Sequence, residues 1–245
     1  FIIPTCLFSF LSIFPGFRFY GHYWLQLLPA LALLTGTSIF IIHELLEKKL
    51  KKNAKWITVA IVITTFTVSF TKEKKYLLSP NYTQVLRRVY GMNPFPETWQ
   101  VAQYIKQKTS PEDEIVALGS EPEIYFYTNR RCASRIAYTS KAVNGSERHK
   151  EWQKELIHDI ETKMPKYIVF YNHPTSWMVQ PGADQTIFKW FNKFASQNYK
   201  LVGIADMQNP YNTRYVWEQK VLQYKPKGQF YILVYERKSD NNKQQ

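Results

Sequence analysis

The sequence predicts a membrane α-helical segment of two to three transmembrane helices, followed by a small extracytoplasmic α/β three-layer domain. Two observations predict this fold class. Residues 1–80 contain three apolar blocks that charged residues separate, whereas residues 81–238 mix charge, proline and short apolar runs, as globular α/β domains do. The composition changes near Ser79 and Pro80, so we place the boundary there. The polar tail, residues 239–245, is predicted to be disordered.

The first apolar block, residues 1–14, lacks the basic residues that begin a signal peptide. We expect it to be the end of a helix in a longer polytopic protein, whose earlier helices precede this chain. A trimmed chain or a gene fragment would begin in the same way.

The second block, residues 22–46, would form a helix about 37 Å long, which is enough to cross a bilayer with some tilt. Pro29 and Gly36 do not argue against this helix, because membrane helices tolerate both residue types. A buried core helix is the alternative interpretation. The aromatic belt expected at the membrane edge of this block consists of Tyr20, Tyr23 and Trp24.

The third block, residues 56–70, is shorter, and its mixture of Ile, Val and Thr would also suit a long strand. We expect a membrane span, because Trp56 fits one interface and the lysines after Phe70 can reach the opposite one. These lysines are Lys72, Lys74 and Lys75.

Lysines between the second and third blocks predict the orientation of the chain. Loops rich in Lys and Arg stay in the cytoplasm, so the domain after Thr71 is expected on the other side of the membrane. The three lysines after the third block favour the opposite orientation, but they are fewer. The loop lysines are Lys48, Lys49, Lys51, Lys52 and Lys55.

The second part of the chain is predicted to alternate helices and strands. Ser120 and Glu123 have the spacing of a capping box, which would open a short helix through Tyr127. The region 207–227 is rich in Asn, Tyr and Pro and forms either an inserted hairpin or a loop. The other predicted helices are 96–108, 146–163 and 184–196, and the predicted strands are 114–118, 135–138, 167–171, 199–204 and 229–235.

Charge and composition exclude several function classes. The formal net charge of +13 is spread along the chain without a nucleic-acid-binding module, so we expect no nucleic-acid partner; attraction to anionic lipid explains the excess. The five histidines lack the spacing and cysteine partners of a metal site, and no glycine-rich phosphate loop or dinucleotide fingerprint occurs. We therefore expect neither metal nor cofactor.

Several segments resemble a known family. The run RFYGHYWLQLLP at residues 18–29, together with EIYFYTNRR at 123–131 and RIAY at 135–138, is similar to segments of bacterial polyprenyl-phosphate-sugar-dependent membrane glycosyltransferases. These enzymes belong to the C-type superfamily and are similar to protein O-mannosyltransferases and lipid A aminoarabinose transferases. The resemblance covers the last membrane helices and most of the outer domain.

The resemblance implies an integral protein of the bacterial inner membrane that transfers a sugar from a polyprenyl-phosphate donor, with inversion. The acceptor would be a glycan, lipid or protein outside the cytoplasm. The family's catalytic carboxylate lies in an early outward loop that has no counterpart here. We therefore expect no catalytic residue in this chain and no activity of this chain alone.

Donor-phosphate binding is the role that the resemblance leaves to these residues. Arg18 is the best candidate, because a guanidinium contacts two phosphate oxygens at once; an anchor to bulk lipid phosphates is the alternative. Tyr20, His22 and Tyr23 can add hydrogen bonds, with an aromatic belt or a structural hydrogen bond as alternatives. Gln26 faces a donor groove or bonds another helix.

Arg130, Arg131 and Arg135 are secondary candidates for contact with an anionic head group, with a solvated basic face as the alternative. The alternative function for the chain is a non-catalytic, membrane-anchored binding or assembly domain of an envelope-polysaccharide pathway. The enzyme hypothesis requires an acidic residue in an early outward loop of the complete protein, and the alternative does not.

Overall fold

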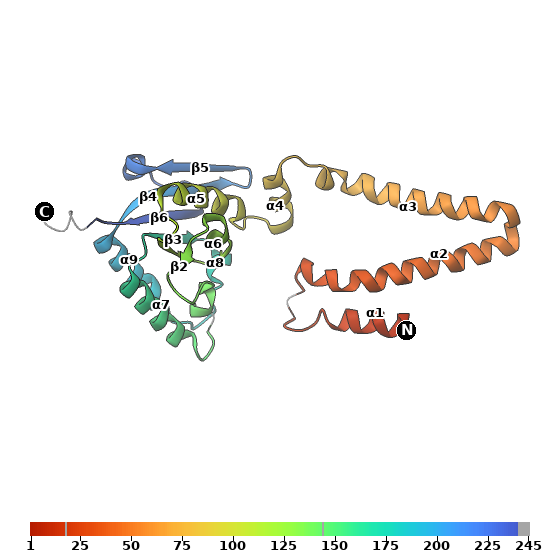
Figure 1. Ribbon diagram of the computed structural model, residues 1–245, viewed down its shortest axis with the longest axis horizontal. Coiled ribbons are helices and arrows are strands. Elements are labelled where there is room, and N and C mark those ends of the chain that lie inside the picture. Colours follow the sequence, from red (N-terminus) through yellow and green to blue (C-terminus); the bar gives the residue numbers. More distant parts are fainter. Residues whose placement is uncertain (18, 144, 240–245) are drawn as a thin grey trace. The chain divides into compact units, whose positions relative to one another are not determined.

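The computed structural model describes residues 1–17, 19–143 and 145–239 and divides the chain into two units (Figure 1). The helical unit comprises Phe1–Ser79, and the α/β unit comprises Pro80–Gln245. Of the tail that we expect to be disordered, residues 240–245 lie outside the described residues.

The helical unit contains one long apolar helical stretch, Gly21–Leu77, of 57 residues. Its length and composition are sufficient to cross a membrane, and 6% of its most apolar window is buried, whereas the core helix of a soluble protein is mostly buried. A signal sequence near an amino terminus would pass the same test. The unit consists of α1 (Ile2–Leu11), a 3-10 helix (Gly21–Leu27), α2 (Leu28–Leu50), a 3-10 turn (Lys51–Asn53) and α3 (Ala54–Leu77).

The helix bounds test two predictions from the sequence, the secondary structure of the third block and the start of the second helix. Residues 56–70 lie inside α3, so the strand alternative for the third block is wrong. The α-helix of the second block begins at Leu28, which places Pro29 in its first turn, where the missing N–H of proline costs no helical hydrogen bond.

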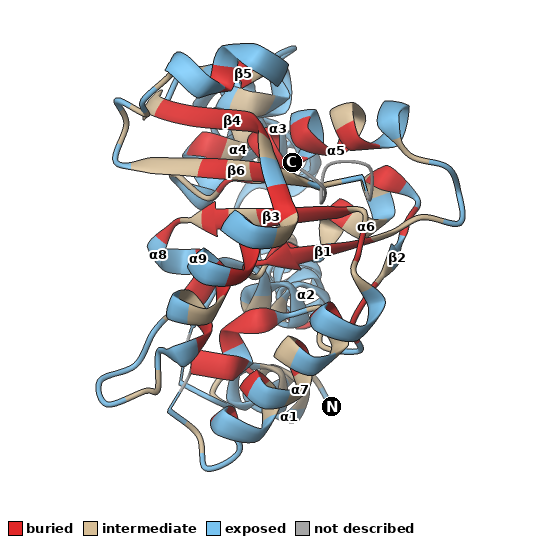
Figure 2. Ribbon diagram, turned by 90° about the vertical axis from the view of Figure 1, so that its left-hand side faces the viewer, coloured by how far each residue is buried: buried red, intermediate tan, exposed pale blue. Residues whose placement is uncertain are grey.

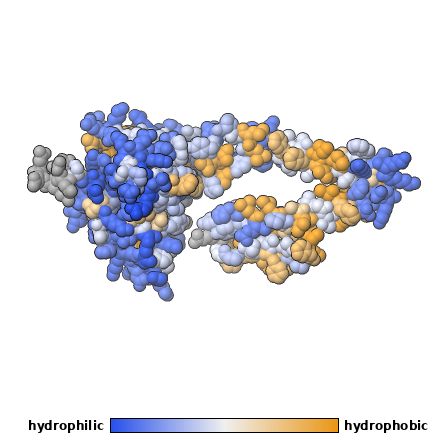
Figure 3. Space-filling view, viewed as in Figure 1, coloured by the Kyte–Doolittle hydropathy of each residue, from blue (hydrophilic) through white to orange (hydrophobic). Residues whose placement is uncertain are grey.

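Several hydroxyl groups along α2 and α3 are satisfied within their own helices. Thr35 Oγ1 donates to Leu31 O at 2.7 Å, Ser38 Oγ to Leu34 O at 2.8 Å, and Thr65 Oγ1 to Ile61 O at 2.9 Å. Such bonds let Ser and Thr face an apolar medium without an unpaired donor. Figure 3 shows hydrophobic surface along both helices and hydrophilic surface at the turn between them.

The α/β unit is built on a mixed six-stranded sheet in the order β2-β1-β3-β6-β4-β5. The pairs β1–β2 and β1–β3 are parallel, and β6, β4 and β5 are joined by antiparallel pairs. This confirms an α/β domain. The strands are β1 (Glu114–Leu118), β2 (Arg131–Cys132), β3 (Tyr167–Asn172), β4 (Tyr199–Asn209), β5 (Asn212–Trp217) and β6 (Phe230–Arg237).

Helices pack on both faces of this sheet. Because side chains alternate along a strand, Ile115 and Ala117 of β1 join the core beneath α5 and α6, whereas Val116 and Leu118 join the core beneath α7 and α9. Figure 2 shows the buried residues concentrated in the central strands. The helices are α4 (Tyr82–Tyr90), α5 (Phe95–Lys108), α6 (Glu123–Thr128), α7 (His149–Lys163), α8 (Pro174–Trp177) and α9 (Thr186–Asn198).

The strand expected at residues 135–138 is wrong. The strand in this region, β2, consists of Arg131 and Cys132. Beyond it, Ile136 donates its backbone N–H to Ser134 Oγ at 3.0 Å, and Ser134 Oγ donates to Asp159 Oδ2 at 2.7 Å. Local side-chain bonds of this kind compete with the sheet ladder.

The region 207–227 contains the inserted hairpin rather than a plain loop. Strand β4 turns into β5, and a 3-10 helix, Glu218–Gln223, follows. Buried Asp206 of β4 holds the segment that leads into β6. Its Oδ1 accepts a hydrogen bond from Gly228 N at 2.8 Å, and its Oδ2 accepts one from Lys227 N at 2.9 Å. A Cβ at Gly228 would lie 2.2 Å from Met207 O, so this close approach requires glycine.

A buried ion pair ties α4, which we did not expect from the sequence, to the rest of the unit. Arg87 Nη2 lies 2.5 Å from Glu97 Oε1 of α5, and the two side chains are 4% and 2% exposed. Arg87 Nε also donates to Pro210 O at 2.9 Å, and Thr213 Oγ1 of β5 donates to Glu97 Oε1 at 2.5 Å. One charge pair thus joins two helices and the β4–β5 hairpin.

Replacing Arg87 with Ala should lower the free energy of unfolding of the α/β unit by about 3–5 kcal/mol, because Glu97 is left buried without its cation. Urea unfolding of the purified chain in detergent measures this change. Lys193→Ala, which removes an exposed cation from α9, is the matched control. A loss below about 1 kcal/mol for Arg87→Ala would contradict the role of the pair.

Candidate functional site

Three of the residues expected to bind the donor phosphate lie together at the start of the long apolar stretch. The rings of Tyr20 and His22 stack with centroids 5.8 Å apart, and Tyr23 contacts them at 5.7 Å and 4.6 Å, respectively. Tyr20 precedes the 3-10 helix Gly21–Leu27, whose tight turn brings these rings to one place. Arg18 lies outside the described residues.

Gln26 bonds a neighbouring helical segment. Its Oε1 accepts a hydrogen bond from Ser12 Oγ, at the end of α1, at 2.8 Å. This is the interhelical bond of the alternative interpretation. The bond ties the 3-10 helix to α1 and so helps to hold the ring group, which consists of Tyr20, His22 and Tyr23.

Arg130 is buried rather than part of a solvated basic face. Its Nε donates to Thr109 Oγ1 at 2.9 Å, and its two terminal nitrogens donate to four backbone carbonyls at 2.7–3.3 Å. These bonds use the whole guanidinium. The expectation of an exposed face is therefore wrong for Arg130, whose side chain ties the end of α5 to the turn after α6.

Arg131 and Arg135 are exposed and bind different carboxylates. Arg131 lies 3.7 Å from Glu112, and Arg135 forms a two-bond pair with Glu155 of α7. Hydrogen bonds from Arg135 lower the pKa of Glu155. The structure therefore does not gather Arg130, Arg131 and Arg135 into one anion site.

The sequence interpretation missed a buried polar group at the sheet. We name it the strand-end cluster; it consists of Thr98, Glu121, Glu123, Tyr171 and Ser176, in which Ser176 bonds Glu121 and the Tyr171 hydroxyl faces Thr98 and both glutamates. Since β1 and β3 are parallel neighbours, their carboxyl ends meet at one edge. Helix α6 follows β1 over one face, and α8 and α9 follow β3 over the other. Open α/β sheets bind ligands at such a switch in strand order.

Glu121 is the central residue of this cluster. It is 5% exposed, its Oε1 accepts a hydrogen bond from Ser176 Oγ, and its Oε2 has no partner within the described part of the chain. A Cβ at Gly119 would lie 2.3 Å from that Oε2, so the glycine makes room for the carboxyl group. Buried polar atoms without partners are rare and point to a function or to a bound molecule.

Burial changes the ionisation of both glutamates. It raises the pKa of Glu121 to about 8, with a smaller contribution from the nearby Glu123 charge, and raises the pKa of Glu123 to about 7. The two carboxyl groups can therefore exchange protons near neutral pH.

The expected capping box at Ser120 and Glu123 is wrong. Helix α6 has Pro122 at its N-cap, without a side-chain cap bond, and Ser120 Oγ accepts from Ser140 N at 3.2 Å. The signal that could have revealed the cluster is a pair of glutamates directly after an apolar strand.

The cluster is not arranged for nucleophilic catalysis by Ser176. The nearby His173 has its Nδ1 2.7 Å from Thr175 Oγ1 and packs on Phe230, and burial lowers its pKa to about 4. Within the described residues, no three His, Cys, Asp or Glu side chains are close enough to hold a metal ion. The chemistry left to the cluster is hydrogen bonding and proton exchange.

No protein-family model matches this chain, and no curated protein matches it in sequence. Its function must therefore be inferred from its residues and their geometry.

The raised pKa of Glu121 predicts a pH-dependent stability. Unfolded chains ionise this carboxyl group near its ordinary pKa, whereas the folded chain keeps the proton until about pH 8. The stabilisation of the parent relative to Glu121→Gln should therefore fall by about 3–4 kcal/mol between about pH 5 and about pH 8. Unfolding curves at both pH values measure it, and exposed Glu147→Gln is the control. A difference that stays constant or grows with pH would contradict the burial of a protonated Glu121.

Proposed function

We propose that this chain contributes the carboxyl-terminal part of an integral-membrane glycosyltransferase. The enzyme would transfer a sugar from a polyprenyl-phosphate donor to an acceptor outside the cytoplasm. The observation that carries the proposal is the ring group of Tyr20, His22 and Tyr23, gathered at the start of the long apolar stretch. The resemblance of residues 18–29 to this class of enzymes agrees with it.

In this proposal α2 and α3 are two membrane spans. Helices α2 and α3 have 23 and 24 residues and would each be about 35 Å long, enough for the hydrocarbon of a bilayer. The lysines around the turn Lys51–Asn53 favour a cytoplasmic turn. The ring group and the α/β unit then belong to the opposite side, in the periplasm of a bacterium.

The ring group supports donor binding by its chemistry. Two phenol hydroxyls and an imidazole can donate hydrogen bonds to phosphate oxygens, and Arg18 is two residues from Tyr20 in the sequence. A guanidinium binds two phosphate oxygens at once, and its bonds are stronger at a membrane edge than in water. Gln26, already bonded to Ser12, serves to position the ring group.

The proposed reaction is a direct displacement at the anomeric carbon. The acceptor oxygen forms a bond to that carbon, the bond to the phosphate oxygen breaks, and polyprenyl phosphate leaves with the electron pair. The acceptor proton passes to a base, which we place outside this chain. The role of Arg18 and the ring group is to stabilise the charge that develops on the departing phosphate.

A second candidate is a non-catalytic, membrane-anchored binding or assembly domain of an envelope-polysaccharide pathway. The unpaired Oε2 of Glu121 at the strand-end cluster favours this role, because it lies where α/β sheets bind ligands. Carboxyl groups that are partly protonated near neutral pH can donate to, as well as accept from, the hydroxyl groups of a glycan.

The test of the first candidate is sugar transfer by the complete protein in its native membrane. Arg18→Ala and His22→Ala should each lower the rate by roughly 10–100-fold, because each removes a bond to the charged phosphate. Expression and membrane insertion are matched, and Lys193→Ala is the control. Undiminished transfer by both variants would reject the donor-binding role. A complete protein that binds glycans but transfers none would favour the second candidate.

A further inference from the structure

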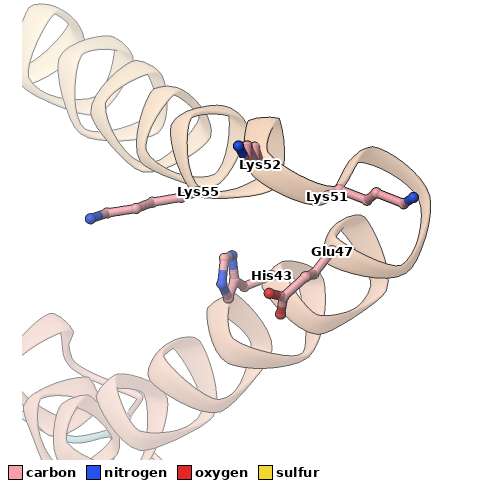
Figure 4. Close-up of a pocket in the computed structure, with 5 residues that line it drawn as sticks. All are labelled: His43, Glu47, Lys51, Lys52 and Lys55. Carbon is pink, nitrogen blue, oxygen red and sulfur yellow. The ribbon is translucent and has the colours of Figure 1, made fainter.

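A basic pocket lies where α2 turns into α3, far along the chain from the ring group. It has a volume of about 440 Å³ and is lined by His43 and Glu47 of α2, Lys51 and Lys52 of the turn, and Lys55 of α3 (Figure 4). His43 and Lys55 lie on facing helices, and the two turn lysines lie at the closed end of the hairpin.

The pocket has a defined base. His43 Nδ1 lies 3.3 Å from Thr58 Oγ1, which joins α2 to α3 just beneath the pocket. Ala54 and Thr58 are buried against the facing helix, at 1% and 9% exposure. The backbone of the turn is therefore fixed at this base, whereas the side chains of Lys51 and Lys55 are exposed and point in opposite directions from the turn (Figure 4).

Positive charge in the pocket is not balanced by the protein. Three lysines line it together with one glutamate, and Lys48 and Lys49 flank it in the last turn of α2. Across residues 1–17, 19–143 and 145–239, no carboxylate forms an ion pair with Lys51, Lys52 or Lys55. The uncompensated charge favours an external anion.

The start of α3 adds to this preference. Its N-cap, Asn53, makes no side-chain cap bond, and its first turn contains no acidic residue. The 3-10 turn runs directly into α3, and Ala54 N–H already donates to Lys51 O, so what favours an anion at this end is the helix dipole. Lys55 occupies this first turn, where a cation is unfavourable unless an anion lies beside it.

The surroundings of the pocket indicate the source of the anion. Apolar helices extend from it on one side and polar surface covers the turn (Figure 3). In a bilayer with α2 and α3 as spans, the turn lies at the depth of the lipid head groups. A phospholipid would place its phosphate in the pocket and its acyl chains along the helices.

We propose that this pocket binds the phosphate group of an anionic membrane phospholipid. The long side chains of Lys51, Lys52 and Lys55 turn their ammonium groups toward the phosphate oxygens when the lipid binds. The lipid holds the two helices at their turn. This inference requires membrane insertion, but it is independent of sugar transfer.

The test places the full chain in nanodiscs of phosphatidylcholine, with or without phosphatidylglycerol, and measures retained phosphatidylglycerol by native mass spectrometry. The parent should retain it. The variant with Lys51→Gln, Lys52→Gln and Lys55→Gln should bind it roughly 100-fold more weakly, since three lysines near anionic lipid are lost. Lys51→Gln alone, in the turn outside both helices, should weaken binding roughly fivefold. This single variant replaces the triple variant in the test if the triple variant fails to insert into the membrane.

The matched control carries Lys72→Gln, Lys74→Gln and Lys75→Gln, which remove the same charge from the other end of α3 and should leave binding within about fivefold of the parent. Equal losses in the two triple variants would overturn the pocket as the site, because only surface charge would then matter. Unchanged binding by the pocket variants would also overturn it. Glycerol phosphate in solution should compete poorly; competition as strong as that of the lipid would overturn the lipid as the source of the phosphate.

Discussion

Exposed apolar surface on α2 and α3 is the constraint on which the rest of the helical unit depends. Most of their Leu, Ile, Val and Phe side chains lack protein cover, and Ala30, Ala54 and Thr58 are the residues of these helices that are buried. Burying one such large side chain contributes about 1.5–3 kcal/mol, so this surface is costly in water. In the proposed membrane placement lipid removes that cost, and the hydroxyl groups that bond within their own helix suit the same medium. The proposed binding roles of the ring group and of the basic pocket both require this placement.

The α/β unit buries several ionisable side chains in its core and accommodates them in two different ways. Arg87 and Glu97 form a buried ion pair, and Arg130 is held by backbone carbonyls. Glu121 has no cation, so burial keeps its carboxyl group protonated up to about pH 8. The first arrangement joins helices to the hairpin and serves stability. The second leaves an unpaired oxygen at the strand ends, which is a cost to stability and the reason to regard that edge as a binding surface.

Local pattern explains which parts of the fold could be predicted. The apolar run of β1 has the same bounds in the sequence analysis and in the structure, Glu114–Leu118, and Trp56 together with the lysines after Phe70 correctly favoured a helix for the third block. Tyr20, His22 and Tyr23 could be grouped because one helical turn contains them. The strand-end cluster could not be predicted, because Glu121 and Ser176 meet only after β1 and β3 pair. The burial of Arg130 also depends on carbonyl groups that folding brings to it, and no pattern around residue 130 reveals them.

Alkaline carbonate extraction of membranes from cells that express the complete protein tests the central claim most directly. A protein whose α2 and α3 are covered by lipid stays in the membrane pellet and is released only by detergent. Release into the carbonate supernatant would contradict the account, because the apolar surface of these helices would then be covered by protein and the ring group and basic pocket would not lie at a membrane.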